Sequence, residues 1–238
     1  MDRELLHTIA KDYNGNPIHI NNAIKGIKYF CPGCNDEFVL RKSGKTGKGS
    51  RRAHFAHKNL TPNCTTEGYL HSSFKILLLD RISSSLKNKL PIDIYWDCIY
   101  CKKEHHTNML IGVCSVEKEY DMKTCRPDIA LLNEKGFIAI VIEIIVSHYP
   151  EDNALSFYRT NNIPLINITL NPLDPIKELE NIDAKIRRPT SVDFLSKMTC
   201  PSYRPYLAQR QRPRLFLRFD PMEAARRKVA WERRRFRF

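Results

Sequence analysis

The sequence predicts an α/β fold in which one α/β unit is flanked by smaller modules. Three features favour this: a helical pattern over 66–89, several short strand patterns after it, and then a helix over 151–161 with an apolar strand over 164–170. A stretch rich in cysteine and glycine precedes this unit, and a strongly basic segment follows it. With 238 residues, of which 42% are hydrophobic, the chain can bury a core of ordinary size.

Residues 1–64 are expected to form a β-hairpin, with "YNGNP" as its turn, and a zinc-binding module. A CxxC pair preceded by an aromatic residue and enclosing Pro-Gly is typical of a zinc knuckle. Five residues compete for four ligand positions: Cys31, Cys34, His54, His57 and Cys64. The favoured set is Cys31, Cys34, His57 and Cys64, with His54 as the alternative to His57.

The helix over 66–89 has an apolar side and a polar stripe. Its apolar residues recur every three or four positions: Leu70, Phe74, Leu77, Leu78 and Ile82. Glu67, His71 and Lys75 lie within about 80° of one another around the helix. Such a stripe is either a solvated face or one side of a site.

Short strands are expected at 91–97, 108–116, 127–133 and 137–146. The last is almost wholly apolar and reads as a central strand buried on both faces, yet Glu143 interrupts it. Burying an unpaired carboxylate is costly. Glu143 can pair with Arg126 or Lys75 inside the fold. Alternatively, Asp128 at the start of the preceding strand joins it at one end of the sheet, and the two carboxylates hold Mg²⁺ or Mn²⁺.

A second CxxC pair, Cys98 and Cys101, suggests a second zinc site. Its other ligands stay open among four residues: His105, His106, Cys114 and Cys125. Cys200 has no assigned role. Eight cysteines in a chain without a signal-peptide pattern favour metal binding or burial over disulfides, and we expect a cytoplasmic protein without a membrane helix.

The net charge of +13 is concentrated in one segment, because residues 204–238 hold twelve Lys and Arg against three Asp and Glu. Such a tail indicates a polyanionic partner, most often nucleic acid. The candidate phosphate-binding residues are Arg41, Lys42, Lys45, Arg51, Arg52, Arg210, Arg212, Arg214, Arg226 and Arg227. Tyr203, Tyr206, Phe216 and Phe219 could stack on unpaired bases. A protein partner for the tail is the other interpretation.

Two resemblances add to these patterns. Pro127-Asp128, followed by an acidic residue in the next apolar strand, resembles the PD-(D/E)XK nuclease superfamily. The superfamily's lysine, two residues after the glutamate, is Ile145 here, so Lys75 or His148 would take its role. The motifs "YFCPGC", "AHFAH" with a following cysteine, "EGYLHSSFK", "RPDIAL" and "IEIIVSH" together resemble the competence protein CoiA-like family, from about residue 10 to 170.

The resemblance implies a restriction-endonuclease-like core over 65–171, with a mixed central sheet flanked by helices. A linker over 172–203 and the basic tail over 204–238 would follow it. The implied function is a metal-dependent DNA phosphodiesterase in DNA processing or the handling of foreign DNA. The alternative is a catalytically inactive, zinc-containing adaptor that binds nucleic acid, with DNA favoured over RNA.

By the same likeness, Glu67, His71, Asp128 and Glu143 fall on motif positions. Asp128, Glu143 and the carbonyl of Ile144 would hold Mg²⁺ or Mn²⁺. Glu67 would position water or a second ion, and Lys75 or His148 would stabilise phosphate charge or act as acid or base.

Overall fold

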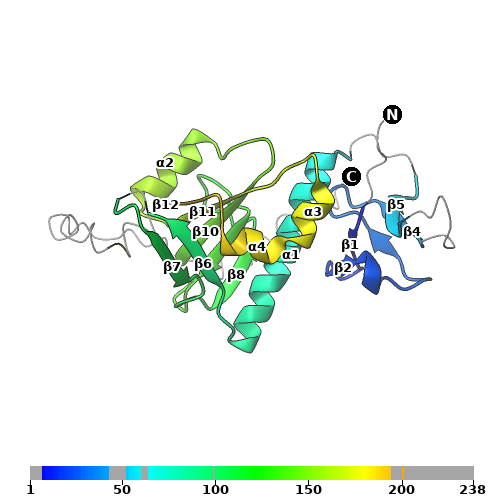
Figure 1. The fold of residues 1–238 in the computed structure, drawn as a ribbon, viewed down its shortest axis with the longest axis horizontal. Helices are drawn as coiled ribbons and strands as arrows, with labels where there is room; N and C mark the ends of the chain where they lie inside the picture. Colours follow the sequence, from blue (N-terminus) through cyan, green and yellow to red (C-terminus); the bar gives the residue numbers. More distant parts are fainter. Residues whose placement is uncertain (1–6, 43–51, 60–63, 99, 194–199, 201–238) are drawn as a thin grey trace.

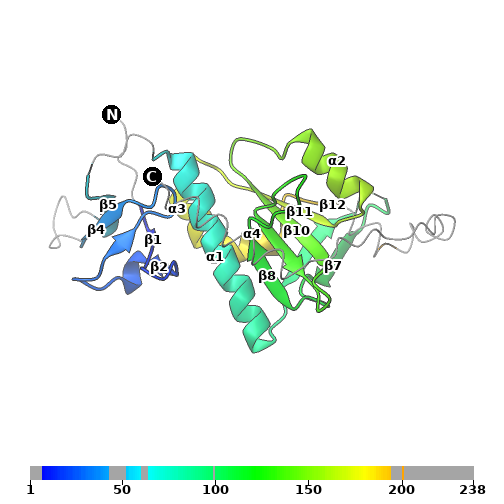
Figure 2. The same cartoon turned by 180° about the vertical axis from the view of Figure 1, so that it is seen from behind.

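The computed structural model describes residues 7–42, 52–59, 64–98, 100–193 and 200. The described chain forms a mixed α/β structure with two five-stranded sheets and one two-stranded sheet. The long helix α1, Thr66–Asn88, lies between the two larger sheets (Figures 1 and 2). The predicted α/β class is therefore confirmed.

The N-terminal sheet is antiparallel, with strand order β2-β1-β3-β4-β5. Its strands are β1 (Ile9–Lys11), β2 (Pro17–His19), β3 (Tyr29–Phe30), β4 (Glu37–Arg41) and β5 (His54–His57). Strands β1 and β2 form the predicted hairpin, and a short 3₁₀ turn, Ile20–Asn22, follows it. Gly15 adopts a positive φ of 85° in the hairpin turn, where glycine is favoured.

The N-terminal sheet docks on α1 through the buried Tyr69. The hydroxyl of Tyr69 accepts hydrogen bonds from the backbone N–H groups of Thr8 and Ile9 and donates one to the carbonyl of Ile9. The helix begins at a Thr65 cap, whose hydroxyl accepts from the Gly68 N–H at 3.0 Å. It ends at Asn88 and is capped by Lys89, whose φ is 55°. The predicted helix is confirmed.

The second sheet is mixed, with order β12-β11-β10-β9-β8. Its strands are β8 (Ser115–Lys118), β9 (Ile129–Leu132), β10 (Ile138–Ile145), β11 (Leu165–Thr169) and β12 (Ser191–Asp193). Strands β10 and β11 are parallel, joined by helix α2 (Asp152–Thr160), whereas the other pairs are antiparallel. Strand β10 is central, as its apolar sequence predicts.

Alternation along β10 divides its side chains between two helices. Ile142 and Ile144 join the core that contains α1, whereas Val141 packs in a smaller cluster with Ala154 and Tyr158 of α2. Glu143 points the same way as Val141 and reaches Tyr158. Both faces of β10 are therefore covered, and Glu143 lies on the α2 side.

Two sequence predictions are corrected by the structure. A strand was expected at 108–116, but β7 (Glu104–Asn108) ends where it was to begin, and a turn separates β7 from β8. β7 pairs instead with β6 (Asp93–Asp97) in the small sheet.

The expected linker over 172–203 contains α3 (Pro175–Glu180), α4 (Ile182–Arg187) and the edge strand β12. Ile186 and Leu179 pack in the same core as α1, so residues 172–193 are part of the fold. Among the described helices, none has the length and apolarity needed to cross a lipid bilayer.

Candidate functional site

Asp128 and Glu143 meet at one end of the mixed sheet. Asp128 directly precedes β9, and the register Ile142–Ile129 places it opposite Glu143. The backbone N–H of Asp128 donates to Glu143 Oε2 at 3.3 Å, and the N–H of Ile144 donates to Asp128 Oδ2 at 2.9 Å. The hairpin of β9 and β10 therefore brings the two carboxylates together, as expected from their spacing.

Lys75 of α1 supplies the cation of this site. Its Nζ lies 2.7 Å from Asp128 Oδ1 and 3.1 Å from Glu119 Oε1. Burial lowers the pKa of Lys75, but the charges and hydrogen bonds of Asp128 and Glu119 outweigh it, so the pKa lies above its ordinary value. Lys75 is therefore a buried cation paired with Asp128.

His71, one helical turn before Lys75, holds the second oxygen of Asp128. Its Nε2 lies 3.0 Å from Asp128 Oδ2. Burial raises the pKa of Asp128, but the hydrogen bond and charge of His71, together with Lys75, outweigh this and hold that pKa below its ordinary value. Asp128 is therefore ionised at neutral pH.

The environment of Glu143 differs from that of Asp128. Its Oε1 accepts a hydrogen bond from the Tyr158 hydroxyl at 2.7 Å. Burial, reinforced by the nearby Asp128 charge, raises the pKa of Glu143 to about 7, although the Tyr158 hydrogen bond acts in the opposite direction. Burial and the Glu143 carboxylate in turn raise the pKa of Tyr158 far above its ordinary range, so Tyr158 remains a donor. Glu143 is poised to exchange a proton near neutral pH.

The remaining predicted site residues are less closely grouped. Glu67 accepts a hydrogen bond from the Ser147 hydroxyl and so lies near the end of β10. His148 is exposed, and no described contact joins it to Asp128 or Glu143. Ile145, which occupies the sequence position of the superfamily's lysine, is buried. Of the two candidates for the missing cation, the structure brings Lys75 and not His148 to the carboxylates.

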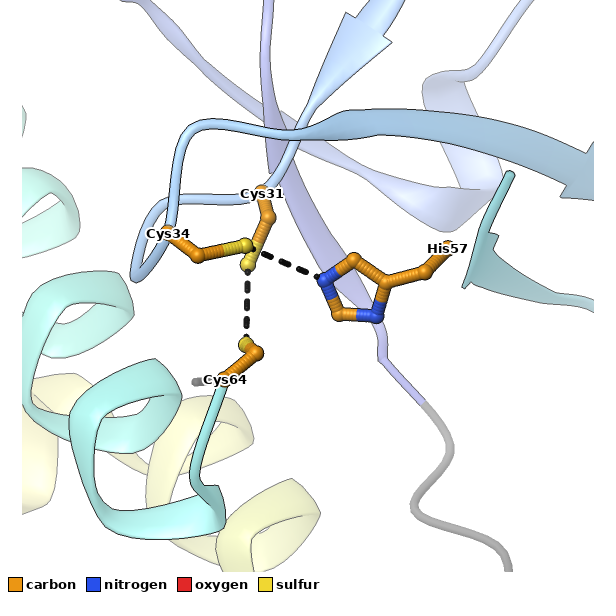
Figure 3. A group of neighbouring side chains, drawn as sticks. All are labelled: Cys31, Cys34, His57 and Cys64. Carbon is orange, nitrogen blue, oxygen red and sulfur yellow. Dashed lines mark hydrogen bonds between the residues drawn. The ribbon is translucent and has the colours of Figure 1, made fainter. Parts of the chain in front are cut away.

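A cysteine and histidine cluster lies in the N-terminal sheet, next to the start of α1 (Figure 3). The ligand atoms of Cys31, Cys34, His57 and Cys64 all lie within 4.8 Å of one another. Cys31 Sγ is 3.6 Å from Cys64 Sγ, and Cys34 Sγ is 3.3 Å from His57 Nε2. Two sulfurs bound to one tetrahedral zinc lie roughly 3.8 Å apart, so the spacing fits a zinc ion. The favoured ligand set is the one that the structure assembles.

His54 does not join this cluster. It lies at the other end of β5, and its Nδ1 is 2.8 Å from the carbonyl of Arg52. Gly33, inside the knuckle, abuts α1 so closely that a Cβ would lie 3.1 Å from the Tyr69 nitrogen. The first cysteine and histidine cluster is thereby packed against the helix that carries His71 and Lys75.

A second cluster of the same composition joins Cys98, Cys101, His105 and Cys200. Of the four open ligand candidates, only His105 takes part; His106, Cys114 and Cys125 do not. Within the described residues, these two clusters are the groups of three or more potential ligands close enough to share one ion. The pair Asp128 and Glu143 belongs to neither.

The predicted phosphate-binding residues are placed only in part. Arg41 and Lys42 are exposed at the end of β4, whereas Arg52 forms an ion pair with Glu180 at 2.8 Å. Seven others lie outside the described residues: Lys45, Arg51, Arg210, Arg212, Arg214, Arg226 and Arg227. The aromatic residues Tyr203, Tyr206, Phe216 and Phe219 also lie outside them.

Sequence reasoning missed three residues that contact the site: Glu119, Tyr158 and Ser147. Glu119 follows β8 with a φ of 51°, and its N–H donates to the carbonyl of Asp128 at 2.9 Å. Tyr158 belongs to the buried side of α2, where an aromatic residue is expected for packing alone. Ser147 directly follows the strand expected over 137–146. That position in the sequence is the one local signal by which Ser147 could have been predicted to lie near the site.

Comparison of this chain with protein-family models, with curated proteins and with solved structures finds no match.

Proposed function

We propose that the chain is a metal-dependent phosphodiesterase of the PD-(D/E)XK type that acts on DNA. One observation carries the proposal: a buried cation, Lys75, lies within 2.7 Å of a carboxylate that meets Glu143 at the end of a mixed sheet. In this arrangement Lys75 supplies from α1 the charge that Ile145 cannot supply from β10. Two carboxylates and one cation, the groups expected of such a site, are therefore present, but the cation comes from α1 and not from β10.

The carboxylate pair fits a hard divalent cation. Both side chains offer oxygen donors, and Mg²⁺ is commonly held by one or two carboxylates while it retains several waters. When bound, the ion would activate a water and neutralise phosphate charge. Asp128 and Glu143 would hold it, and Ile144 could add its carbonyl.

The protein groups have separate roles in this proposal. Both oxygens of Asp128 already accept from Lys75, His71 and the Ile144 N–H, so a bound cation must share Asp128 with these donors or displace one. Lys75 freed from Asp128 can then neutralise a phosphate oxygen. Glu67 and His71 lie on the same side of α1 and can orient water at the site.

The substrate class rests on charge. The basic segment over 204–238 and the exposed Arg41 and Lys42 suit a phosphate backbone, which would give salt-dependent binding with little sequence preference. We therefore propose DNA as the substrate, in a DNA-processing role.

One observation favours the alternative of a non-catalytic adaptor. Asp128 is fully engaged by protein donors, as an internal ion pair would be. In that case the zinc modules and the basic tail bind nucleic acid and the carboxylates only stabilise the fold.

Assays for cleavage of labelled single- and double-stranded DNA with Mg²⁺ or Mn²⁺ distinguish the nuclease from the non-catalytic adaptor. The variants are Asp128→Asn at the site and Glu117→Gln, an exposed residue of β8, as the control. The proposal expects cutting by the wild type and the control, and a loss of about 100-fold or more in Asp128→Asn with DNA binding retained. Equal DNA binding without cutting in all three, across substrates and metals, would support the adaptor.

A further inference from the structure

We propose that Cys98, Cys101, His105 and Cys200 form a second structural zinc site, which joins Cys200 to the β6–β7 hairpin. Three thiols and one imidazole are a donor set typical of closed, tetrahedral zinc sites. The four ligand atoms lie within 4.8 Å of one another, and Cys98 and Cys200 are buried.

The second knuckle repeats the backbone of the first. In the first, the Asn35 N–H donates to the Cys31 carbonyl at 3.0 Å, and Asn35 has a φ of 67°. In the second, the Lys102 N–H donates to the Cys98 carbonyl at 2.9 Å, and Lys102 has a φ of 57°. A non-glycine residue with positive φ is uncommon. Its presence directly after both CxxC pairs indicates the same ligand-presenting turn.

A further backbone bond completes the likeness. The N–H of each first cysteine donates to a carbonyl five residues on: Cys31 to Asp36 at 2.8 Å and Cys98 to Lys103 at 2.9 Å. Each knuckle also joins two antiparallel strands, β3 with β4 and β6 with β7. The two segments share only the CxxC pattern, yet they form the same type of turn, which presents both thiols of each pair on one side.

The histidine of the second site is positioned by the hairpin. His105 lies in β7 opposite Trp96, and the two rings stack with centroids 5.9 Å apart. Its Nε2 is 3.0 Å from Cys101 Sγ, close to the 3.3 Å between Cys34 and His57 in the first cluster. His106, the next residue, stacks on Tyr95 and takes no part.

Cys200 closes the site from far along the chain. The hairpin is a two-stranded sheet, which is marginally stable without further support. Part of that support comes from α4 and its end, because Arg187 lies over the Tyr95 ring and Arg188 pairs with Glu104. A metal that joins Cys200 to the knuckle adds a second fastening between the C-terminal segment and the hairpin.

This site has a consequence for the basic tail. The basic segment over 204–238 follows Cys200 in the sequence, so zinc at Cys200 would fix the position of a residue four positions before that segment. The metal site itself does not depend on the proposed cleavage, because its ligands are separate from Lys75, Asp128 and Glu143. Loss of the second zinc can therefore be measured without loss of the proposed cleavage activity.

The test counts zinc in the full-length protein by native mass spectrometry and metal analysis. The wild type should hold two zinc ions per chain, matching the two clusters, and Cys200→Ser should hold one. Cys200→His, which keeps a residue that zinc also accepts, should restore the second. Cys114→Ser, an exposed cysteine outside both clusters, should leave two.

Hydrogen exchange tests the fastening. Cys200→Ser should raise exchange in 93–108 and leave the N-terminal sheet unchanged. One zinc ion in the wild type that Cys200→Ser retains, or a Cys98–Cys200 disulfide in protein freshly purified in reducing buffer, would overturn the metal site. A second zinc ion lost in Cys200→Ser without any change in hairpin exchange would overturn the fastening.

Discussion

Lys75 Nζ lies 2.7 Å from Asp128 Oδ1, so a lysine from α1 neutralises the carboxylate at the start of β9. The same lysine reaches Glu119 at 3.1 Å. In the proposed site, Lys75 and a divalent cation would compete for Asp128. Both would bring positive charge to the place where phosphate charge would develop.

Replacing Lys75 should separate metal binding from cleavage. Lys75→Met removes the competitor, so Mn²⁺ affinity should rise, whereas cleavage should fall about 100-fold or more because the charge on phosphate is no longer neutralised. Removing one partner of a buried pair should also lower the free energy of unfolding by about 3 kcal/mol. Isothermal titration, cleavage assays and urea unfolding measure the three effects.

The control for this variant is Lys87→Met, an exposed lysine of the same helix. It should change none of the three quantities. Equal or faster cleavage by Lys75→Met would show that Lys75 has only a structural role.

Glu143 gives the fold a pH dependence near neutrality. Because the native state raises the Glu143 pKa to about 7, it holds this proton more tightly than the unfolded chain does. The stabilising contribution is full below the unfolded pKa near 4.5 and is lost as the pH rises through about 7. Wild type should lose up to about 3 kcal/mol across this window.

Glu143→Gln cannot ionise and should lack this loss. Urea unfolding at several pH values from about 4.5 to 8 measures the difference between the two proteins. Asp128 acts in another window, because its lowered pKa gives stability that is lost as the pH falls. Parallel stability curves for wild type and Glu143→Gln would contradict the raised pKa.

Tyr158 should act as a positioning residue for Glu143. Tyr158→Phe removes the hydroxyl that donates to Oε1, and the pKa of Glu143 should then rise further. The pH at which Mn²⁺ binding reaches half its maximum should move upward, and stability should fall by about 1 to 3 kcal/mol. Tyr149→Phe, at an exposed tyrosine, is the control. A stability loss with no shift in the pH midpoint would limit Tyr158 to packing.

Zinc content should distinguish the two histidines that are candidate ligands of the first cluster. His57→Ala removes a ligand, so zinc content should fall by one ion per chain and the melting temperature should drop, because zinc binding contributes to folding. His54→Ala should keep the zinc, although His54 is buried and its loss also destabilises the sheet. Metal analysis after dialysis separates the two variants, and zinc loss in His54→Ala alone would reverse the assignment.

The sequence predicts those parts of the site whose signal is local. The periodicity of Leu70 and Phe74 predicts α1 and with it the stripe of Glu67, His71 and Lys75. A carboxylate within an apolar strand marks Glu143, because burial of an unpaired charge is unfavourable.

Contacts between distant segments could not be predicted in this way. Glu119 follows a short, exposed strand, and Tyr158 has the pattern of an ordinary core residue. Cys200 stands apart from any CxxC pair and meets Cys98 only through tertiary structure. The edge strand β12 was missed because its few residues follow two short helices with weak patterns.

The central claim is that Glu143 is tolerated in a central strand because, with Asp128, it holds a divalent cation. Titration of Mn²⁺ into the zinc-loaded protein, followed by electron paramagnetic resonance at about pH 8, tests it most directly. We predict saturable binding of Mn²⁺ to the wild type that Mg²⁺ displaces, and a loss of about tenfold or more in Glu143→Gln. Mn²⁺ binding that is absent from the wild type, or unchanged in Glu143→Gln, would contradict the claim.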